Sequence, residues 1–232
     1  MINLYGIIFA LGFVIVFIVA RLYFKSKNKA PDLAYTGLIY IILGTLIGAR
    51  LFHVFYYSPS YFLAHPVEIL YIWQGGLSFH GGLIGVLIAG FIFCRKHKVD
   101  FLEIADLMVI PVSLFLGLGK IANFFNSELY GKLTDLPWCV NFQGVEGCRH
   151  PVQFYEAAKN LALFFFLFYL HSKKTKKGTL FLAFIFLYTL LRFFIDFFRE
   201  YDAVYLGLGS GQFLNLAAFI VSGYFLVKLV RK

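Results

Sequence analysis

Long apolar stretches separated by short polar connections run through the whole chain. A membrane-spanning helix needs about 20 consecutive, mostly apolar residues. Seven stretches fit this pattern, at residues 5–24, 33–57, 75–94, 104–125, 155–171, 178–198 and 207–229. Nothing resembles the alternating segments of about ten residues that build a transmembrane barrel. The pattern therefore predicts an all-α, polytopic membrane protein with seven transmembrane helices.

The polar connections are too short to fold as a separate soluble domain. We therefore expect residues 1–232 to form a single transmembrane helical domain, with a small extracytoplasmic loop region at about 126–154. The composition agrees, because 60% of the residues are hydrophobic and only 14% are charged. Soluble domains have a much larger charged share.

Basic residues on alternate connections predict the orientation. Under the positive-inside rule they place the N-terminus outside and the C-terminus in the cytoplasm. The net charge of +9 then reports topology rather than a nucleic-acid surface, and we expect no nucleic-acid partner. Residues 1–20 have no basic region before their apolar run, so we expect an uncleaved first span rather than a signal peptide. The basic residues concerned are Arg21, Lys25, Lys27, Lys29, Arg95, Lys96, Lys98, Lys173, Lys174, Lys176, Lys177, Lys228, Arg231 and Lys232.

Four ionisable residues lie inside the apolar stretches: Arg50, His80, Lys120 and Arg192. Each costs about 2.5–3.5 kcal/mol in hydrocarbon on the lenient insertion scale, so such residues usually mark a site or a substrate path. With the predicted orientation, all four fall in the outer half of the bilayer. They therefore predict one polar pocket below the outer surface.

Each polar residue also has a structural alternative. Arg192 and Asp196 are four residues apart and could neutralise each other. Arg50 could extend to the outer headgroups. Asn123 and Gln212 could be hydrogen-bonding contacts between helices.

The glycines around His80, in segment 75–85, could serve only to let two helices approach closely. A single His in an apolar helix is also more often structural than catalytic. The clustering favours a shared site, because unrelated structural residues would be scattered over both leaflets.

The charges of the predicted pocket indicate its ligand. Its basic residues outnumber its one acidic residue, Asp196, so it favours an anion. A guanidinium group binds phosphate through its bidentate fork, and Lys adds a point charge. His80 is the natural general base, because its unperturbed pKa is near 6.5. These features predict an enzyme that acts on phospholipid at the extracytoplasmic leaflet, without a cofactor.

The cysteines add little. Cys139 and Cys148 share the predicted outer loop, where a disulfide and two free thiols are both open alternatives. No Cys or His spacing resembles a metal site.

Several motifs, in order along nearly the whole chain, are similar to those of the prolipoprotein diacylglyceryl transferase family. They are Tyr5-Gly6, GGLSFHGGLIG at 75–85, NFFNSELYG at 123–131, RHPVQFYE at 149–156, YTLLRFFIDFFR at 188–199 and Gly211-Gln212.

The resemblance implies transfer of the diacylglyceryl group of phosphatidylglycerol to a cysteine thiol. That cysteine belongs to the lipobox in the signal peptide of a bacterial preprolipoprotein. The products are a thioether and glycerol phosphate. The resemblance also implies a multi-pass protein of the bacterial cytoplasmic (inner) membrane, with its active site facing the outer leaflet and with the lipid bilayer as its environment.

The resemblance and the residue patterns together predict the site residues. Arg192 would hold the phosphate and stabilise the leaving group. His80 would orient or deprotonate the thiol, and the division of labour between His80 and the arginines stays open. The expected catalytic residues are His80, Arg192, Lys120 and Tyr5. The expected substrate-binding residues are Asn123, Glu128, Gly131, Tyr188, Arg50, His150, Gly81 and Gly82.

One position departs from the family pattern of Gly-Arg-Ile-Gly-Asn, because this chain reads Gly119-Lys120-Ile121-Ala122-Asn123. Lys keeps the charge but loses the bidentate fork. The alternative function is therefore a catalytically altered or silent family member that binds phospholipid or lipoprotein precursor. A transporter is disfavoured, because it would place its polar groups at the bilayer midplane and often show inverted repeats.

Overall fold

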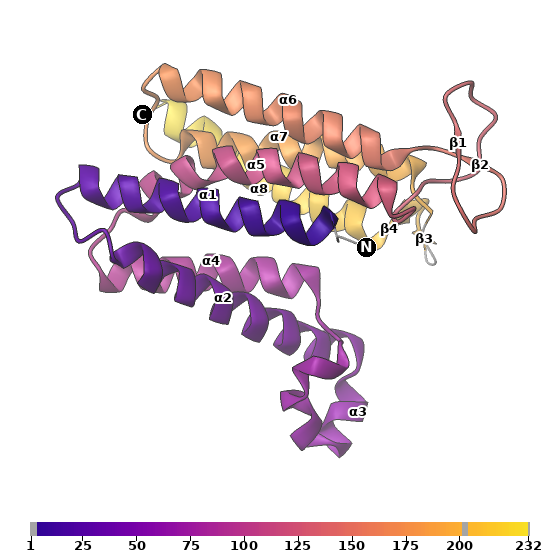
Figure 1. The fold of residues 1–232 in the computed structure, drawn as a ribbon, viewed down its shortest axis with the longest axis horizontal. Helices are drawn as coiled ribbons and strands as arrows, with labels where there is room; N and C mark the ends of the chain where they lie inside the picture. Colours follow the sequence, from indigo (N-terminus) through magenta and orange to yellow (C-terminus); the bar gives the residue numbers. More distant parts are fainter. Residues whose placement is uncertain (1–3, 201–203, 232) are drawn as a thin grey trace. The chain divides into compact units, whose positions relative to one another are not determined.

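The computed structural model describes residues 4–200 and 204–231 (Figure 1). The chain divides into two compact units. Unit 1 comprises Met1–Val16 and Ala105–Lys232, and unit 2 comprises Phe17–Ile104.

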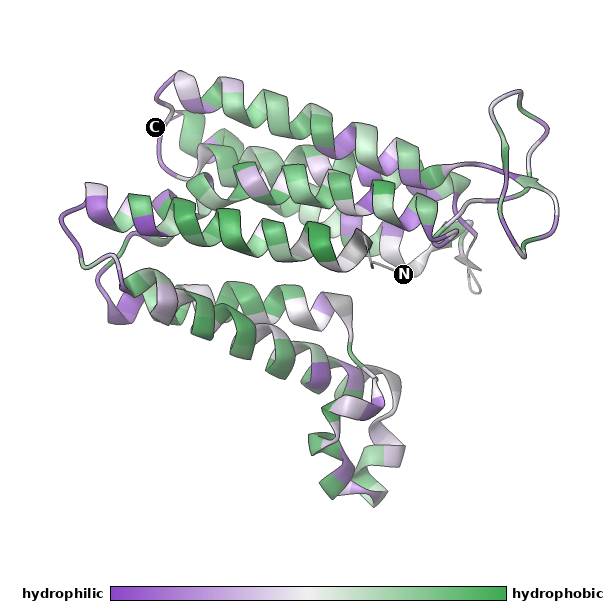
Figure 2. Cartoon of the chain, in the orientation of Figure 1, coloured by the Kyte–Doolittle hydropathy of each residue, from purple (hydrophilic) through white to green (hydrophobic). Residues whose placement is uncertain are grey.

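The described residues are mostly helical, as the apolar pattern predicts. The helices are α1 (Leu4–Ser26), α2 (Leu33–Phe52), α3 (Pro59–Ala64), α4 (Phe79–Lys96), α5 (Phe101–Phe125), α6 (Val152–Ser172), α7 (Thr179–Ile195) and α8 (Ser210–Arg231). The strands are β1 (Val140–Asn141), β2 (Cys148–Arg149), β3 (Val204–Tyr205) and β4 (Leu208–Gly209). Figure 2 shows apolar residues along most of each long helix and hydrophilic residues at many of the connections.

Five of the described helices are long and apolar enough to cross a membrane: α1, α2, α5, α7 and α8. The prediction of a helical, polytopic membrane protein is confirmed at this level. The 18-residue α4 and the helix α6 are not among the five. Charged and amide side chains lower the hydropathy of the first half of α6, including Glu156 and Lys159.

In unit 2, α2 and α4 pack against each other through glycines. A Cβ atom at Gly48 would collide with the carbonyl oxygen of Gly81, and one at Gly85 would collide with that of Gly44. Any side chain here would push the helices apart, so these glycines serve close helix packing. Toward the basic end of the pair, Phe24 is buried with residues of α2 and α4.

The predicted start of the third span at residue 75 is wrong, because α4 begins at Phe79. Gly75 and Gly76 have φ angles of 89° and 68°, which a helix cannot accommodate. Ser78 is extended, and its side chain accepts a hydrogen bond from the Gly81 N–H at 3.5 Å, which caps the helix. His80 therefore lies in the first turn of α4.

The connection from α2 to α4 contains more structure than the sequence indicated. A π-helical turn, His53–Tyr57, continues α2, and α3 and two 3₁₀ turns follow, at Pro66–Leu70 and Ile72–Gln74. These elements are too short to give a readable hydrophobic period.

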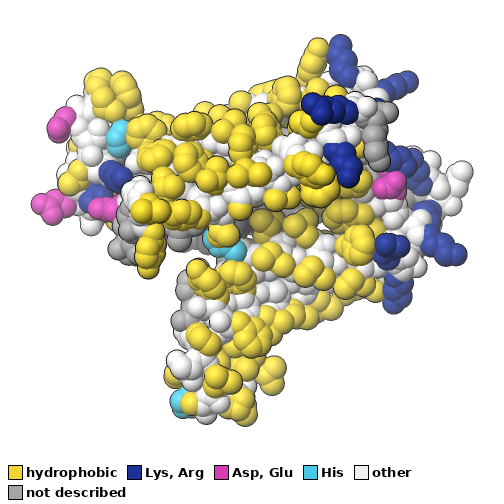
Figure 3. All heavy atoms as spheres, turned by 180° about the vertical axis from the view of Figure 1, so that it is seen from behind, with side chains coloured by type: hydrophobic (Ala, Val, Ile, Leu, Met, Phe, Trp, Pro, Cys, Tyr) yellow, Lys and Arg dark blue, Asp and Glu magenta, His cyan; other side chains and the backbone are white. Residues whose placement is uncertain are grey.

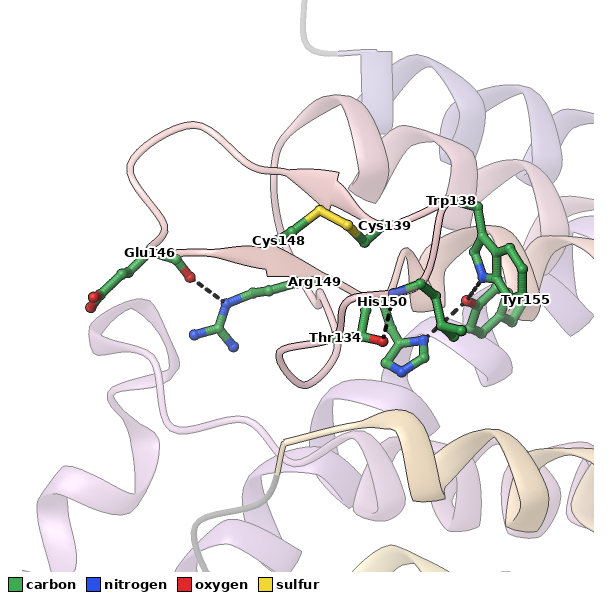
Figure 4. Close-up of a disulfide and its surroundings, with 9 residues drawn as sticks. Thr134, Trp138, Cys139, Glu146, Cys148, Arg149, His150 and Tyr155 are labelled. Carbon is green, nitrogen blue, oxygen red and sulfur yellow. Dashed lines mark hydrogen bonds between the residues drawn. A yellow bond between two sulfur atoms is a disulfide. The ribbon is translucent and has the colours of Figure 1, made fainter.

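Unit 1 contains α5, α6, α7, α8 and the first residues of α1. Its apolar core joins Val109 and Ile110 of α5 to Leu167 of α6 and Leu180 of α7. Between α5 and α6, β1 and β2 form an antiparallel hairpin. A disulfide links Cys139 to Cys148 beside it (Figure 4), so the alternative of two free thiols is wrong.

Basic side chains gather at one end of the long helices within each unit (Figure 3). In unit 1, Lys176 donates from the α6–α7 connection to the carbonyls of Leu229 and Val230 at the end of α8. In unit 2, Lys29 of the α1–α2 connection donates to the carbonyl of His97, the residue that follows α4. This distribution is the one on which the predicted orientation depends.

Candidate functional site

Buried charges from three helices meet in unit 1. We call this group the charge cluster, and its members are Lys120 of α5, Glu156 and Lys159 of α6, Arg192 of α7, and Asp196, which directly follows α7. Three of them, Glu156, Lys159 and Asp196, are almost fully buried. Because buried charges are costly unless they are paired, the arrangement of the pairs decides what the cluster does.

Arg192 contacts both acidic members of the cluster. Its Nη1 donates to Glu156 Oε1, and its Nε lies 2.9 Å from Asp196 Oδ1. The structural alternative for Arg192 and Asp196 is thus partly right, since the two residues do pair. However, Arg199 Nη1 also lies 3.9 Å from the same Asp196 oxygen, so that carboxylate is shared between two guanidinium groups.

Lys159 completes the network from α6. Its Nζ lies 2.8 Å from Glu156 Oε2, so the Glu156 carboxylate bridges Lys159 and Arg192. The same Nζ lies 3.6 Å from the centroid of the Tyr188 ring on α7, which is a cation–π contact. Lys159 therefore ties α6 to α7 through one acidic and one aromatic partner.

Lys120 is close enough to interact electrostatically with Glu156, Arg192 and Asp196. The structure thus brings together three residues predicted for the site, Lys120, Tyr188 and Arg192. Sequence reasoning missed Glu156 and Lys159, although both fall in the predicted span 155–171. The rule that found the other charges, a charge inside an apolar stretch, would have found these two as well.

Asn123 and Glu128 hold the turn that follows α5. Asn123 Nδ2 donates to Glu128 Oε2 at 3.0 Å, and the Glu128 N–H donates to the Asn123 carbonyl at 2.9 Å. Gln153 Nε2 of α6 donates to the Glu128 carbonyl at 2.7 Å. On either side of Glu128, Ser127 and Leu129 have φ angles of 56° and 58°, a conformation uncommon for residues other than glycine. These contacts keep a strained turn in place beside the first turn of α6.

Gly131 has a packing requirement of its own. A Cβ atom there would lie 2.6 Å from Val152 Cγ2 and 2.8 Å from His150 Cβ. The Gly131 N–H donates to the His150 carbonyl at 2.9 Å. Glycine is therefore needed where this loop crosses the start of α6.

His150 lies between the loop and α6 (Figure 4). Its Nδ1 is 3.2 Å from the Tyr155 hydroxyl, which also accepts a hydrogen bond from Trp138 Nε1 at 2.9 Å. Its ring is 5.0 Å from that of Phe198. Burial lowers the pKa of His150, which favours the neutral imidazole.

A pocket of about 240 Å³ adjoins the charge cluster through Asp196. Gln212 lines it, but both ends of its amide are engaged: Nε2 donates to the Phe193 carbonyl at 3.1 Å, and Oε1 accepts from the Gly209 N–H at 2.9 Å. This supports the structural alternative for Gln212. The lining residues are Lys132, Asp196, Phe197, Arg199, Glu200, Gly207, Gly209 and Gln212.

Arg50 belongs to unit 2 and is held there by backbone carbonyls. Its Nε donates to Ile69 at 2.9 Å, its Nη1 to Gly75 at 2.8 Å and Gly76 at 3.2 Å, and its Nη2 to Glu68 at 2.5 Å. Only 6% of Arg50 is exposed. It does not extend to solvent, which is evidence against the headgroup alternative.

His80 also lies in unit 2, half-buried, with its ring centroid 6.3 Å from that of Phe52. Gly81 serves the contact with α2, whereas a Cβ atom at Gly82 would make contacts no closer than 3.4 Å, to Thr45 Cγ2. The side chain of Tyr5 lies outside the described residues. The prediction that His80 and Arg50 share one pocket with Lys120 and Arg192 stays a prediction.

The charge cluster is suited to a phosphate-type anion. Its three cations exceed its two carboxylates, and an arginine with lysines beside it is a favourable arrangement for phosphate. Among the described residues, no group of three or more His, Cys, Asp or Glu side chains is placed to hold a metal ion.

Comparison with known proteins places the chain in a family. The family described as prolipoprotein diacylglyceryl transferase matches residues 1–228. A phosphatidylglycerol–prolipoprotein diacylglyceryl transferase of Geobacter sulfurreducens is 39% identical, over 90% of this chain and 82% of its own length. Relatives of the same name are 39% identical in Bordetella avium, over 94% and 87%, and 42% identical in Roseobacter denitrificans, over 84% and 76%. The chain belongs to the prolipoprotein diacylglyceryl transferase family.

Proposed function

We propose that this protein transfers the diacylglyceryl group of phosphatidylglycerol to the lipobox cysteine of bacterial preprolipoproteins. The observation that carries the proposal is the charge cluster, a buried, net-positive group in a chain of this family. An anionic phospholipid is a substrate that such a cluster suits, because its phosphate places one negative charge at membrane depth. The names of the relatives support the same activity.

The transfer is a substitution at carbon. The cysteine sulfur attacks the glycerol carbon of the diacylglyceryl group that carries the phosphate ester. A C–S bond forms and the C–O bond breaks, and the bonding electron pair leaves on the oxygen of glycerol phosphate. In this proposal His80 accepts the thiol proton, because a free thiol with a pKa near 8.5 is mostly protonated at neutral pH. No cofactor or outside oxidant is needed.

The cationic members of the cluster stabilise the leaving group. Cleavage of the C–O bond adds negative charge to the phosphate, so Arg192 and Lys120 interact more strongly with the transition state than with the substrate. In this proposal, the headgroup site is shaped by the remaining predicted residues. They are Asn123, Glu128, Gly131, Tyr188, His150 and Tyr5, with Gly81, Gly82 and Arg50 of unit 2.

The proposed setting is the bacterial cytoplasmic (inner) membrane. Seven spans, with the N-terminus outside and the C-terminus in the cytoplasm, would direct the charge cluster to the outer leaflet. The basic ends of the helices support this orientation. The disulfide of the loop 126–154 suits an oxidising compartment, which supports the same side.

The comparisons do not favour the alternative of a silent family member, which rests on Lys120. Complementation separates the two. The chain should restore lipoprotein modification to bacteria depleted of their own transferase, whereas a silent binder would leave precursors unmodified. The matched variant His80→Ala should insert in the membrane and fail to restore modification. Full rescue by His80→Ala would contradict the role of His80 without removing the enzyme proposal.

An assay with purified protein tests the substrates directly. Defined phospholipids and a synthetic lipobox peptide are mixed with the protein, and the peptide mass is measured. We expect the mass of one diacylglyceryl group to be added with phosphatidylglycerol and not with phosphatidylethanolamine. A lipobox peptide with serine in place of cysteine should gain no mass, and transfer to it would contradict the thiol mechanism.

A further inference from the structure

We propose that Lys159 sets the net charge of the cluster and thereby makes the site select an anionic phospholipid as donor. This inference rests on the proposed function and assigns its donor specificity to a residue of this chain. Lys159 lies beyond the motif at 149–156, in the interior of α6, so the sequence resemblance does not include it.

The argument begins with the charges that surround Arg192. Without Lys159, the cations Lys120 and Arg192 face the carboxylates Glu156 and Asp196 one for one. Arg199, whose side chain is 20% exposed, adds a more strongly screened positive charge at the edge, 3.9 Å from Asp196. With Lys159, three cations face two carboxylates. A cluster whose buried charges balance distinguishes an anionic headgroup from a zwitterionic one only weakly, whereas one further buried positive charge makes the distinction strong.

The position of Lys159 makes its charge effective. The side chains of Lys159 and Glu156 are each 2% exposed, so water screens their charges weakly. Glu156 accepts from each cation with a different carboxylate oxygen, Oε2 from Lys159 and Oε1 from Arg192. A carboxylate shared in this way neutralises Arg192 less completely than one that Arg192 holds alone.

Lys159 also positions a residue of the predicted headgroup site. Its ammonium lies 3.6 Å from the ring centroid of Tyr188, a short cation–π contact between α6 and α7. Tyr188 is one helical turn before Arg192 on α7, so both side chains point to the same face of that helix. Lys159 acts through its neighbours, as a positioning residue rather than a catalytic one.

The test is the kinetics of Lys159→Met in the full-length protein. Met keeps the unbranched shape of Lys and removes its charge. We expect the KM for phosphatidylglycerol to rise about tenfold and kcat to change less than about threefold. The reason is that the excess charge attracts both the bound donor and the transition state, since both are anionic. The matched control is Lys27→Met, which removes the same charge from an ion pair with Glu103 in unit 2 and should leave KM unchanged.

Two further variants separate charge from shape. Lys159→Arg keeps the charge and should keep the KM of the wild type. The double variant Glu156→Gln/Lys159→Met returns the cluster to one excess positive charge, since two cations then face Asp196 alone. It should recover most of the tenfold loss in KM. A double variant no better than Lys159→Met would overturn the proposal, as would a Lys159→Met protein that is less stable but has the KM of the wild type.

A binding measurement keeps this inference separate from the proposed function. The protein is placed in nanodiscs that contain equal amounts of phosphatidylglycerol and phosphatidylethanolamine and is then purified out of them. The lipids that stay bound to the protein are identified by mass spectrometry. We expect the wild type to retain phosphatidylglycerol preferentially and Lys159→Met to lose that preference. This result in a protein without transferase activity would reject the proposed function alone. If the wild type is active and Lys159→Met retains phosphatidylglycerol as selectively as the wild type does, only the role of Lys159 is rejected.

Discussion

Two arginines, the buried Arg50 in unit 2 and the half-buried Arg192 in unit 1, are held in opposite ways. Arg50 donates to four backbone carbonyls of the connection between α2 and α4. Arg192 instead contacts two carboxylates, Glu156 and Asp196, and lies among further cations. Both would look alike in a sequence, since each is a single arginine near the end of an apolar helix.

The difference indicates which of the two arginines a ligand could reach at lower cost. An anion could reach Arg50 only by displacing the carbonyls that shape the connection, so the cost falls on the fold. At the charge cluster an anion adds to a group that already has excess positive charge, and existing ion pairs need only rearrange. If the proposed function is right, Arg192 should contribute mainly to the chemistry, and Arg50 mainly to holding the connection between α2 and α4.

The largest effect should come from Arg192. We expect Arg192→Met to lower kcat/KM by about a thousandfold, the upper range for removing one group that stabilises transition-state charge. Peptide lipidation by the purified variant measures this. Arg192→Lys should be intermediate, because it keeps the charge and loses the fork. A fully active Arg192→Met with native thermal stability would remove Arg192 from the site.

The next effect should be structural and should come from Arg50. We expect Arg50→Met to lower the free energy of unfolding by about 3 kcal/mol, because several carbonyls lose their donor. Chemical denaturation in detergent measures it. The kcat/KM of the folded fraction should fall far less than in Arg192→Met. The comparison fails if Arg50→Met keeps wild-type stability and loses activity as severely as the Arg192 variant.

Lys120 should have a smaller effect on activity than Arg192. Lys120→Ala removes one cation of the cluster, and we expect kcat/KM to fall about thirtyfold. Lys120→Arg should match or exceed the wild type, because it supplies the fork that the lysine lacks. Equal rates in the wild type and both variants would place the Lys120 side chain outside the site.

The smallest effect should come from Asn160 of α6. It is 1% exposed, and within the described part of the chain its amide nitrogen and oxygen have no hydrogen-bond partner. Replacing it with a similar apolar shape in Asn160→Leu should raise the free energy of unfolding by about 1 kcal/mol. A melting temperature below that of the wild type would show that the amide is satisfied after all.

Much of the fold could be predicted because apolar length is a strong signal. Each predicted stretch overlaps most of one of the long described helices, with ends that differ by a few residues. The shift of the start of α4 from 75 to Phe79 has a local cause, since Gly75 and Gly76 adopt positive φ and Ser78 caps the helix. The short elements between Tyr57 and Gly75 left no signal, because they contain less than two turns each.

The site was less predictable, for two reasons. A sequence gives the depth of a charge but not its partners, so Arg50 and Arg192 were both assigned to the same predicted pocket. Glu156 and Lys159 were readable as charges in an apolar stretch, but their function depends on the neighbouring helix, which places Tyr188 and Arg192 beside them. Spacing along one helix does not reveal a partner on the next one.

The division into units also bears on how the chain is made. Unit 2 is one continuous segment, Phe17–Ile104, whereas unit 1 needs both Met1–Val16 and residues that follow Ile104. During synthesis from the N-terminus, all of unit 2 exists before most of unit 1 has been translated. The α2–α4 hairpin, whose helices pack through glycines, can therefore assemble early in translation. The charged residues of α6 and α7 are translated only after the whole of unit 2.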